Sequence, residues 1–369
     1  MKLHVCVAPF VRLIETVANE TKSALMNSLP NNERALLVAA EKILFEAATN
    51  RSLGPSEVRV KMQAATICGS DISYFMNGRS GSFELKTPFV LGHEGSGVIV
   101  EIGSAVESIG VGDQIAINPS NPCRNCYFCA RGRSNLCENM RYFGSASTNP
   151  PVDGLFSKYV ILRVEQCIPL PSNLAHNHGP LVEPASVAMH AVNRSGLQAG
   201  DDVLIIGAGA VGLLTLRIAQ AIGSRSISVV EPSELRREGA RKEGAAFAVS
   251  PQEISTLPAP DVVFECSGTS SGLSGAIERV RKGGVVVQVG GMLETTPISS
   301  QLIMSRELSL LGSFRFAEEP AQVIGLIEAN RLSLDGLIES EWSFGEIEGA
   351  LRAAASGKYL KVMLKFEEF

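Results

Sequence analysis

The second half of the chain alternates short apolar runs with amphipathic stretches of helical length, and this alternation restricts the fold more than any other feature. The runs typical of buried strands are Val203–Ile206, Ser226–Val230, Val262–Glu265 and Val285–Val289. The stretches with helical periodicity between them are Val211–Ala221, Glu234–Lys242 and Leu273–Arg281. Strands and helices that alternate in this way build a parallel sheet with helices on both faces. The pattern predicts an α/β fold with a doubly wound parallel sheet.

A glycine-rich motif, Gly207-Ala-Gly209-Ala-Val211-Gly212, lies between the first of these strands and the helix that follows it. Glycines in this position let the backbone approach a pyrophosphate group, which then sits at the N-terminus of the helix. An ordinary glycine-rich turn is the alternative, but the strand before the motif and the helix after it favour a dinucleotide site. We therefore assign Gly207, Gly209, Val211 and Gly212 to cofactor binding.

An acidic residue, Glu231, ends the next strand, 19 residues after Gly212. A carboxylate at this place accepts hydrogen bonds from the hydroxyls of the adenosine ribose and repels a 2′-phosphate. The sequence therefore predicts NAD rather than NADP as the cofactor. Arg236, five residues later, is also assigned to the cofactor site, and its charge opposes this preference because it attracts a phosphate.

Four of the eight cysteines, Cys123, Cys126, Cys129 and Cys137, lie within 15 residues of one another. Four thiolates this close in sequence can surround one tetrahedral Zn²⁺ at about 2.3 Å each and leave no open position for a substrate. Disulfides are the alternative, but adjacent CxxC pairs rarely close sound disulfides. We expect a structural zinc site.

Length and charge narrow the class of protein. A chain of 369 residues, of which 45% are hydrophobic, is long enough for two domains. The net charge of −5 gives no basic field for nucleic acid. No apolar run reaches the roughly 18–20 residues that span a bilayer, and the N-terminus lacks a secretory signal. We expect a cytoplasmic protein whose partners are small molecules and other copies of the chain, with no membrane contact.

The first half of the chain has the pattern of a β-rich domain. Every second side chain from Val58 to Ala64 is apolar, as in a half-buried strand, and short strands are expected at Gly97–Ile102 and Gln114–Ile117. The strand and helix alternation of the second half ends after about Leu311. The remaining residues are too few for a core of their own, so we expect them to return to the first domain.

A third group of candidate residues comprises Cys68, His93, Glu94 and Glu183, none of which is diagnostic alone. An isolated Cys or His usually belongs to the core, and an isolated Glu is usually solvated. The surrounding text is more specific. Cys68 stands in Thr-Ile-Cys-Gly-Ser-Asp, and His93 and Glu94 stand in Gly-His-Glu-Gly-Ser-Gly.

The segment from Gly92 to Val106 resembles the signature of the zinc-containing alcohol dehydrogenases of the medium-chain dehydrogenase/reductase superfamily, and the likeness covers residues 34 to 369. Within that superfamily the chain is similar to the polyol dehydrogenases, and above all to L-idonate 5-dehydrogenases. The segments that carry this likeness are Ala116-Ile-Asn-Pro-Ser, Met140-Arg141-Tyr-Phe-Gly-Ser-Ala, Pro151-Val-Asp-Gly154 and Gly312-Ser-Phe-Arg315-Phe316.

This resemblance implies a domain plan. A GroES-like, β-rich catalytic domain is expected over residues 34–184, a Rossmann domain that binds NAD over 185–312, and a return to the catalytic domain over 313–369. Residues 1–33 would form an extension of unknown role, with an incorrectly assigned start codon as the alternative. The resemblance also implies a homodimer or homotetramer.

The resemblance further implies two zinc ions per chain and assigns the catalytic one. Cys68 and His93 are expected as ligands, with Glu94 or Glu183 completing the shell, and an open position is what Lewis-acid catalysis needs. Ser70 would relay the alcohol proton, and Arg315 would lie beside the substrate.

One position departs from the family pattern, because Ser73 replaces a histidine that commonly passes the proton to solvent. We expect activity to persist, with a changed pH dependence. The remaining isolated residues, among them Cys167, Cys266 and His190, are expected to belong to the core rather than to a site.

Three functions remain open at this stage. The first is the oxidation of L-idonate to 5-keto-D-gluconate with NAD⁺, which requires a cation for the substrate carboxylate, and Arg315 and Arg141 are the candidates. The second is a dehydrogenase for sorbitol or xylitol. The third is a catalytically inactive relative that senses NAD, which the full set of expected ligands argues against.

Overall fold

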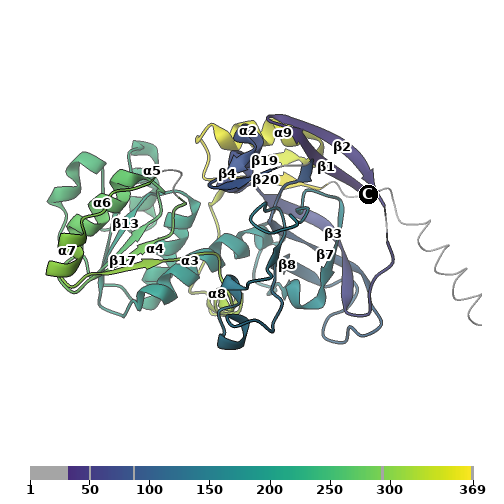
Figure 1. The fold of residues 1–369 in the computed structure, drawn as a ribbon, viewed down its shortest axis with the longest axis horizontal. Helices are drawn as coiled ribbons and strands as arrows, with labels where there is room; N and C mark the ends of the chain where they lie inside the picture. The colour runs from purple at the N-terminus through teal and green to yellow at the C-terminus, as the bar shows by residue number, and fades with distance from the viewer. Residues whose placement is uncertain (1–31, 50, 86–87, 292–294, 367–369) are drawn as a thin grey trace, which may run out of the picture.

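The computed structural model describes residues 32–49, 51–85, 88–291 and 295–366. They form two units side by side, a parallel-sheet unit and a β-rich unit (Figure 1). Nearly all of the predicted N-terminal extension, residues 1–31, lies outside the described residues. Its last two positions, Asn32 and Glu33, belong to the first strand of the β-rich unit, β1 (Asn32–Ala39).

The parallel-sheet unit has six strands in the order β15-β14-β13-β16-β17-β18, and every neighbouring pair is parallel. This is the predicted doubly wound α/β sheet. Its strands are β13 (Asp202–Ile206), β14 (Ser226–Val230), β15 (Phe247–Val249), β16 (Val262–Glu265), β17 (Val285–Gln288) and β18 (Ser309–Gly312). Its helices are α4 (Ala210–Ile222), α5 (Glu234–Lys242), α6 (Ser270–Arg279) and α7 (Ser300–Ser305), with the 3₁₀ turn η5 (Pro251–Thr256).

Both faces of this sheet are covered, which explains why its strands are apolar throughout. On one face Val203 and Ile205 of β13 pack with α4 and with α3 (Val182–Ser195). On the other face Leu204 and Ile206 pack with α6 and α7. Helix α6 begins three residues before the predicted start, because the Thr269 side chain caps it by accepting a hydrogen bond from the Gly272 amide.

The β-rich unit is built on a seven-stranded sheet in which β11 pairs with β3 beside the order β12-β8-β7-β3-β20-β19. Its strands are β3 (Glu57–Thr66), β7 (Glu94–Ile102), β8 (Gln114–Ile117), β11 (Tyr159–Arg163), β12 (Cys167–Pro169), β19 (Ile338–Ser343) and β20 (Lys361–Lys365). The predicted alternation from Val58 to Ala64 is present in β3, and those side chains are buried.

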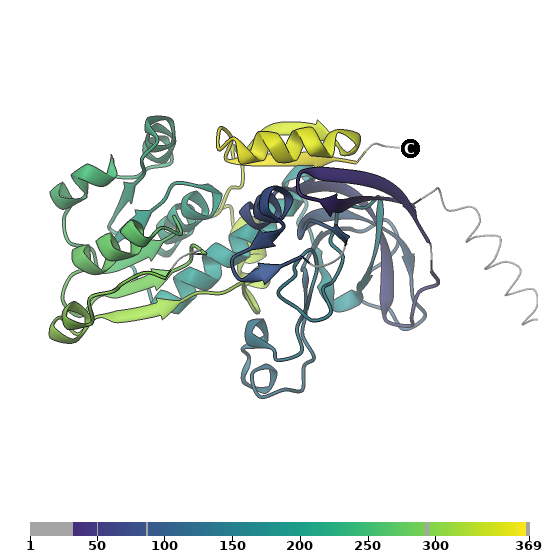
Figure 2. The same ribbon diagram turned by 45° about the horizontal axis from the view of Figure 1, so that its top comes forward.

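Smaller elements complete the β-rich unit. Besides β1, the strands outside the large sheet are β2 (Lys42–Ala48), β4 (Arg79–Ser80), β5 (Phe83–Glu84), β6 (Phe89–Val90), β9 (Ser120–Asn121) and β10 (Arg141–Tyr142). The helices and 3₁₀ turns are α2 (Gly69–Asn77), α9 (Ile347–Ala355), η1 (Cys129–Arg131), η2 (Ser134–Leu136), η3 (Val164–Gln166), η4 (His176–Leu181) and η6 (Phe344–Glu346). The segment with η1 and η2 projects from the junction of the two units (Figure 2).

The C-terminal segment contributes to both units. Helix α8 (Glu319–Glu328) packs against α3, and Val323 and Ile327 belong to the core of the parallel-sheet unit. The chain returns to the β-rich sheet only from β19 onward. Strand β19 pairs with β20, and β20 pairs with β3. The return predicted at residue 313 therefore takes place later, because α8 has an apolar face that needs the α3 surface. The predicted boundary between residues 184 and 185 falls inside α3.

No helix in the described ranges has the length and apolar character needed to cross a membrane.

Candidate functional site

A cavity of about 300 Å³ lies where the two units meet. The β-rich unit supplies Cys68, Ser70, His93 and Glu94 to its wall, and the parallel-sheet unit supplies the N-terminal turn of α4 through Val211. Helix α3 crosses the junction and contributes Glu183, Pro184 and Val187. The structure thus brings the predicted catalytic group and Val211 of the dinucleotide motif to one cavity.

Three of the predicted ligands, Cys68, His93 and Glu94, form a cluster whose ligand atoms all lie within 4.8 Å of one another. Cys68 is the N-cap residue of α2, and Glu94 is the first residue of β7. Thr66 pairs with Glu94 across β3 and β7, so the ladder itself places the cysteine loop beside His93 and Glu94. A thiol, an imidazole and a carboxylate at this spacing are a set of donors that suits zinc.

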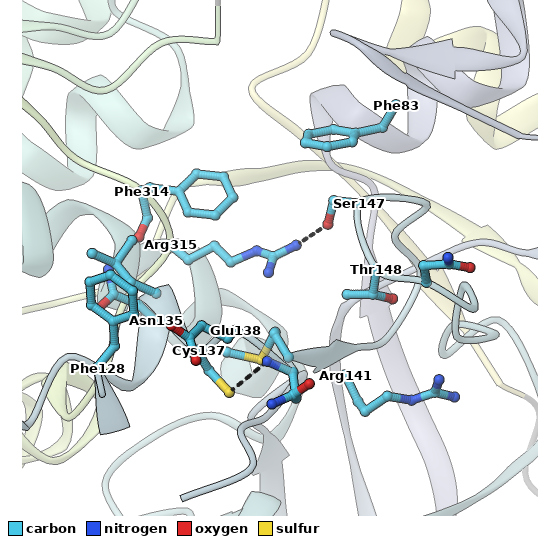
Figure 3. Close-up of a pocket in the computed structure, with 14 residues that line it drawn as sticks. Phe83, Phe128, Asn135, Cys137, Glu138, Arg141, Ser147, Thr148, Phe314 and Arg315 are labelled. Atoms are coloured by element: carbon cyan, nitrogen blue, oxygen red, sulfur yellow. Dashed lines mark hydrogen bonds between the residues drawn. The ribbon is translucent and has the colours of Figure 1, made fainter. Parts of the chain in front are cut away.

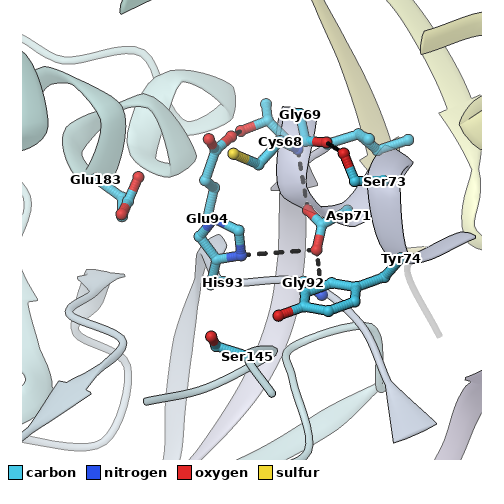
Figure 4. A network of polar contacts seen from close by, with 12 residues as sticks. Cys68, Gly69, Asp71, Ser73, Tyr74, Gly92, His93, Glu94, Ser145 and Glu183 are labelled. Atoms are coloured by element: carbon cyan, nitrogen blue, oxygen red, sulfur yellow. Dashed lines mark hydrogen bonds and ion pairs between the residues drawn. The ribbon is translucent and has the colours of Figure 1, made fainter. Parts of the chain in front are cut away.

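Asp71 organises this cluster from behind (Figure 4). Its carboxylate accepts hydrogen bonds from the amides of Cys68, at 2.9 Å, and Gly92, at 3.1 Å. It also lies 3.6 Å from Nδ1 of His93. Burial lowers the pKa of His93, but the charges of Asp71 and Cys68 outweigh that effect and raise it well above its ordinary value. The 3.6 Å separation is an ion-pair distance rather than a hydrogen bond, and a carboxylate on the Nδ1 side of the ring leaves Nε2 for a metal.

Glu94 is held by a buried cation. The ammonium group of Lys361, the first residue of β20, lies 2.5 Å from both carboxylate oxygens, and the Thr66 hydroxyl donates to one of them. Lys361 and Glu94 are only 6% and 1% exposed. Because a buried charge is stable only when it is paired, these two residues fix each other's position.

Glu183 lies on α3 and faces the cluster from the other side of the cavity (Figure 4). It accepts a hydrogen bond of 2.9 Å from the Tyr142 hydroxyl. Burial, together with the charge of Glu94, raises the pKa of Glu183 to about 7. Burial and the charge of Glu183 in turn raise the pKa of Tyr142 well above its usual value. A divalent cation would relieve the repulsion between these buried acids, so the donor set fits a metal site.

The two serines after Cys68 have different surroundings. Ser70 lines the cavity, as expected for a hydroxyl that receives a proton from the substrate. The Ser73 hydroxyl donates to the Gly69 carbonyl at 3.0 Å within α2. The Ser73 side chain is therefore engaged within the helix and does not line the cavity.

The two candidate arginines also differ. Arg315 lines the cavity, and its guanidinium lies 3.7 Å from the centroid of the Tyr142 ring and donates to the hydroxyls of Ser145 and Ser147. Among the described residues it forms no ion pair with a carboxylate. Burial lowers its pKa. Arg141 is exposed, donates to the Pro150 carbonyl and extends away from Arg315 (Figure 3). Arg315 is therefore the better partner for an anionic substrate group.

The four-cysteine lobe gathers its sulfur atoms as predicted, since those of Cys123, Cys126, Cys129 and Cys137 all lie within 4.8 Å of one another. The closest pairs are 3.4 Å and 3.5 Å apart. A disulfide requires about 2.05 Å, whereas sulfurs around a tetrahedral zinc lie about 3.8 Å apart. The spacing suits a closed metal site.

The four thiols differ in pKa because backbone amides and burial act on them unequally. Hydrogen bonds from backbone amides, first that of Asn125, lower the pKa of Cys123 to about 6. Burial raises the pKa of Cys137 to about 12, even though the Cys123 amide lies 3.2 Å from its sulfur. Without a cation the four sulfurs therefore do not ionise together, and a bound metal would supply the missing charge.

The glycine motif has the shape of a phosphate site. Gly207 has φ of +100°, and a Cβ on Gly212 would lie 1.9 Å from the Gly207 carbonyl oxygen, so both need glycine for the turn itself. Gly209, the N-cap residue of α4, is different, because no described atom lies within 4 Å of the Cβ that it lacks. The space in front of this helix N-terminus is open, as a site for a pyrophosphate requires.

The acidic residue after β14 is buried, and it is attached to the glycine loop. One oxygen of Glu231 accepts from the Ala208 amide at 2.8 Å, and the other accepts from the Ser233 amide at 3.0 Å. Arg236 does not turn toward this carboxylate, since it donates to the Gly357 carbonyl of the C-terminal segment at 2.7 Å. Arg237 instead contacts the Glu231 and Pro232 carbonyls.

Sequence reasoning missed the residues that support the cluster, namely Asp71, Tyr142 and Lys361. Asp71 follows Cys68 by three residues, so the capping position of α2 could have indicated it. Lys361 gave no signal, because a lysine at the start of a strand is usually exposed. Only the pairing of β20 with β3 brings it to Glu94.

Comparison with known proteins agrees with this geometry. The profile of the alcohol dehydrogenase GroES-like domain matches residues 54–172, and that of the zinc-binding dehydrogenases matches residues 210–329. The chain is 33% identical over 356 residues to the probable D-xylulose reductase A of Aspergillus clavatus, covering 92% of this chain and 98% of the relative. It is 32% identical to the sorbitol dehydrogenase of Bacillus subtilis, covering 92% and 99%.

Two solved structures have the same fold over almost their whole length. The L-idonate 5-dehydrogenase of Escherichia coli gives a TM-score of 0.84 at 30% identity, covering 91% of this chain and 99% of that one. A zinc-binding dehydrogenase from Sinorhizobium meliloti, described as putative and bound to NADP, gives 0.83 at 29% identity, with the same coverage.

Proposed function

Because this chain belongs to the zinc-dependent medium-chain dehydrogenases, we propose that it oxidises a secondary alcohol of a sugar acid with NAD⁺, as an L-idonate 5-dehydrogenase does. The observation that carries the sugar-acid assignment is Arg315, a largely buried cation in the cavity wall whose described partners are two serine hydroxyls and two aromatic rings. A carboxylate that enters such a cavity must lose water, which costs several kcal/mol unless a cation meets it.

We propose two zinc ions per chain, one for each of the two clusters. The lobe of Cys123, Cys126, Cys129 and Cys137 would hold one ion in a closed site. Cys68, His93 and Glu94 would hold the other, with Glu183 as the alternative to Glu94. When bound in the open site, zinc supplies the Lewis acidity that lowers the pKa of the substrate alcohol.

The protein's own groups prepare the reaction. Asp71 keeps the His93 ring oriented, and Lys361 keeps Glu94 in place. Ser70 Oγ receives the alcohol proton at the cavity wall and passes it toward solvent. Val211 and Val289 line the same cavity from the parallel-sheet unit, so a nicotinamide ring placed there would have apolar neighbours and little access to water.

The cofactor is proposed to be NAD. Glu231 is buried at the place where a 2′-phosphate would approach, and its charge repels that group. Arg236 is engaged with Gly357, which reduces its ability to attract the phosphate. We expect kcat/KM with NAD⁺ to exceed that with NADP⁺, and Glu231→Ser to narrow the difference. A wild-type preference for NADP⁺ would contradict this assignment.

A second candidate is a dehydrogenase for sorbitol or xylitol, which the similarity to D-xylulose reductase A and sorbitol dehydrogenase favours. Both candidates use the same alcohol chemistry and differ in whether the substrate carries a carboxylate. Arg315 can also bind hydroxyl groups, so substrate kinetics must separate the two.

Steady-state kinetics on L-idonate, sorbitol and xylitol provide the test. We expect kcat/KM for L-idonate to exceed that for sorbitol by at least about tenfold, which corresponds to roughly 1.4 kcal/mol. Arg315→Met should remove this advantage and reduce sorbitol turnover less, because sorbitol has no carboxylate. Arg141→Met serves as the control, since Arg141 lies outside the catalytic cavity. A wild-type preference for sorbitol or xylitol would leave the polyol assignment in place of the sugar-acid one.

A further inference from the structure

We propose that Asn135, His190 and Glu319 form a positioning clamp that holds Arg315 in the cavity, so that the four-cysteine lobe helps to set the affinity for substrate. This inference rests on the proposed function only in taking Arg315 as a substrate contact. The three clamp residues come from three separate parts of the chain, namely η2 of the lobe, helix α3 and the start of α8.

The clamp residues form hydrogen bonds with the backbone before and after Arg315. On one side, Nδ2 of Asn135 donates to the Phe314 carbonyl at 2.9 Å. On the other side, Oε2 of Glu319 accepts from the Ala317 amide at 2.6 Å. Figure 3 shows a pocket next to the catalytic cavity. Asn135 lies on the same side of this pocket as Phe314 and Arg315, opposite Ser147 and Thr148. The segment that carries Arg315 is therefore fixed at two points.

His190 connects Asn135 to Glu319. Its Nδ1 lies 2.8 Å from Oε1 of Glu319, and its Nε2 lies 3.4 Å from Nδ2 of Asn135. Because Nδ1–H donates a hydrogen bond to the carboxylate, Nε2 of the neutral ring is left to accept one from the Asn135 amide. Asn135, His190 and Glu319 are 6%, 9% and 7% exposed. In a buried network of hydrogen bonds in which every donor has an acceptor, the connected groups are held in one arrangement.

The backbone of Arg315 needs such support. Its φ is +55°, in the left-handed region that residues other than glycine seldom adopt. Residues held in this region persist only where the surroundings impose the conformation, and they are frequent at binding sites. This conformation allows the guanidinium to reach Ser147 and to lie over the Tyr142 ring. If the Phe314 carbonyl were released, the backbone would be free to relax and the guanidinium would leave the ring.

The clamp also connects Arg315 to the lobe. Asn135 belongs to η2, two residues before Cys137, and the lobe wall from Asn135 to Arg141 lines an outer chamber of about 670 Å³ that shares Arg315 with the catalytic cavity. The lobe therefore has a second role beside stability. It presents the amide that fixes the substrate-binding arginine.

The test is Asn135→Ala, with Asn173→Ala as the matched control. Nδ2 of Asn173 also donates to a backbone carbonyl, that of Ile327, at 2.9 Å, but Asn173 lies outside the catalytic cavity and the clamp. For the substrate with the highest wild-type turnover, we expect Asn135→Ala to lower kcat/KM by at least about tenfold, mainly through KM. Zinc content should stay at the wild-type value. Asn173→Ala should leave KM unchanged, while its thermal midpoint of unfolding should be comparable to that of Asn135→Ala.

A double-mutant cycle with Arg315→Met separates positioning from a general structural effect. If Asn135 acts through Arg315, Asn135→Ala will have almost no further effect on KM in the Arg315→Met background. The proposal would be overturned if Asn135→Ala lowered kcat/KM equally in both backgrounds, or if it did not lower kcat/KM in the wild-type background. Failure of the proposed function has a different result, because the wild type itself would then prefer sorbitol or xylitol to L-idonate, or would oxidise none of the three.

Discussion

The four-cysteine lobe and the Cys68 cluster both gather donors that suit zinc, but the chain brings these donors together in different ways. The lobe takes all four thiols from residues 123 to 137, and short 3₁₀ turns fold them onto one point. The Cys68 cluster combines the cap of α2 with the start of β7, and the cation that holds Glu94 comes from β20, 267 residues along the chain.

We propose that this difference separates a structural site from a reactive one. All four thiols of the lobe come from one short segment that lies outside the catalytic cavity, so loss of its metal site should reduce stability before it affects the chemistry. The Cys68 cluster has one side open to the cavity and is supported by buried charges from distant strands. Its loss should remove the chemistry, and the loss of its supports should destabilise the fold. The predictions below test this division.

The largest effect is expected for Cys68→Ser, which should lower kcat by at least about 10³-fold because the open metal site loses its thiolate. The variant should keep a native circular dichroism spectrum, and metal analysis should show one zinc ion fewer per chain. Cys167→Ser is the control, since Cys167 lies outside both clusters. Turnover retained in Cys68→Ser would contradict the assignment of this cluster.

The next effect concerns the support of the open site. Lys361→Met should reduce the free energy of unfolding by about 3–5 kcal/mol, because it leaves Glu94 buried without its cation. Lys365→Met on the same strand removes only an exposed pair with Glu341 and should cost less than about 1 kcal/mol. Adding Glu94→Gln should restore part of the stability lost in Lys361→Met, as measured by chemical denaturation. No recovery would mean that Lys361 acts through packing alone.

A smaller loss, of about 2–4 kcal/mol, is expected for Cys126→Ser, because the lobe loses a cross-link. Its kcat should fall far less than that of Cys68→Ser, while the clamp predicts a rise in KM. Thermal unfolding and kinetics on the same preparation measure both. If kcat falls as strongly as in Cys68→Ser, the division between a structural and a reactive site is wrong.

The smallest effect depends on pH and tests the link between the two regions. Burial raises the pKa of Glu319, but hydrogen bonds from His190 and the Ala317 amide outweigh it and lower the pKa to about 2. An unfolded glutamate titrates near 4.3, so this group contributes up to about 3 kcal/mol above that pH and loses the contribution as the pH falls toward 2.

Denaturation of wild type and Glu319→Gln from pH 7 to pH 3.5 measures that contribution. The difference in unfolding free energy should be constant above about pH 5 and shrink below it. A difference that stays constant down to pH 3.5 would show that the Glu319 carboxylate contributes no charge-dependent stability.

Much of the fold and of the site could be predicted from local patterns. Strands β8, β14 and β16 and helix α5 have the predicted bounds, because a period of two or 3.6 residues is a property of neighbouring residues. The four-cysteine lobe and the glycine motif are local in the same sense. The return of the chain was expected too early, since the contact between α8 and α3 has no local sign.

The sequence by itself determined the four-cysteine motif, the dinucleotide motif and the class of fold, because each of these depends on residue types at short, fixed spacings. Only the tertiary structure decided which donors meet and what supports them. Lys361 reaches Glu94 through strand pairing, and Arg315 keeps its strained backbone through Asn135 and Glu319. The physical reason is that pairing a buried charge and holding a strained backbone both depend on groups far away in the chain, whose proximity is set by the packing of the whole molecule.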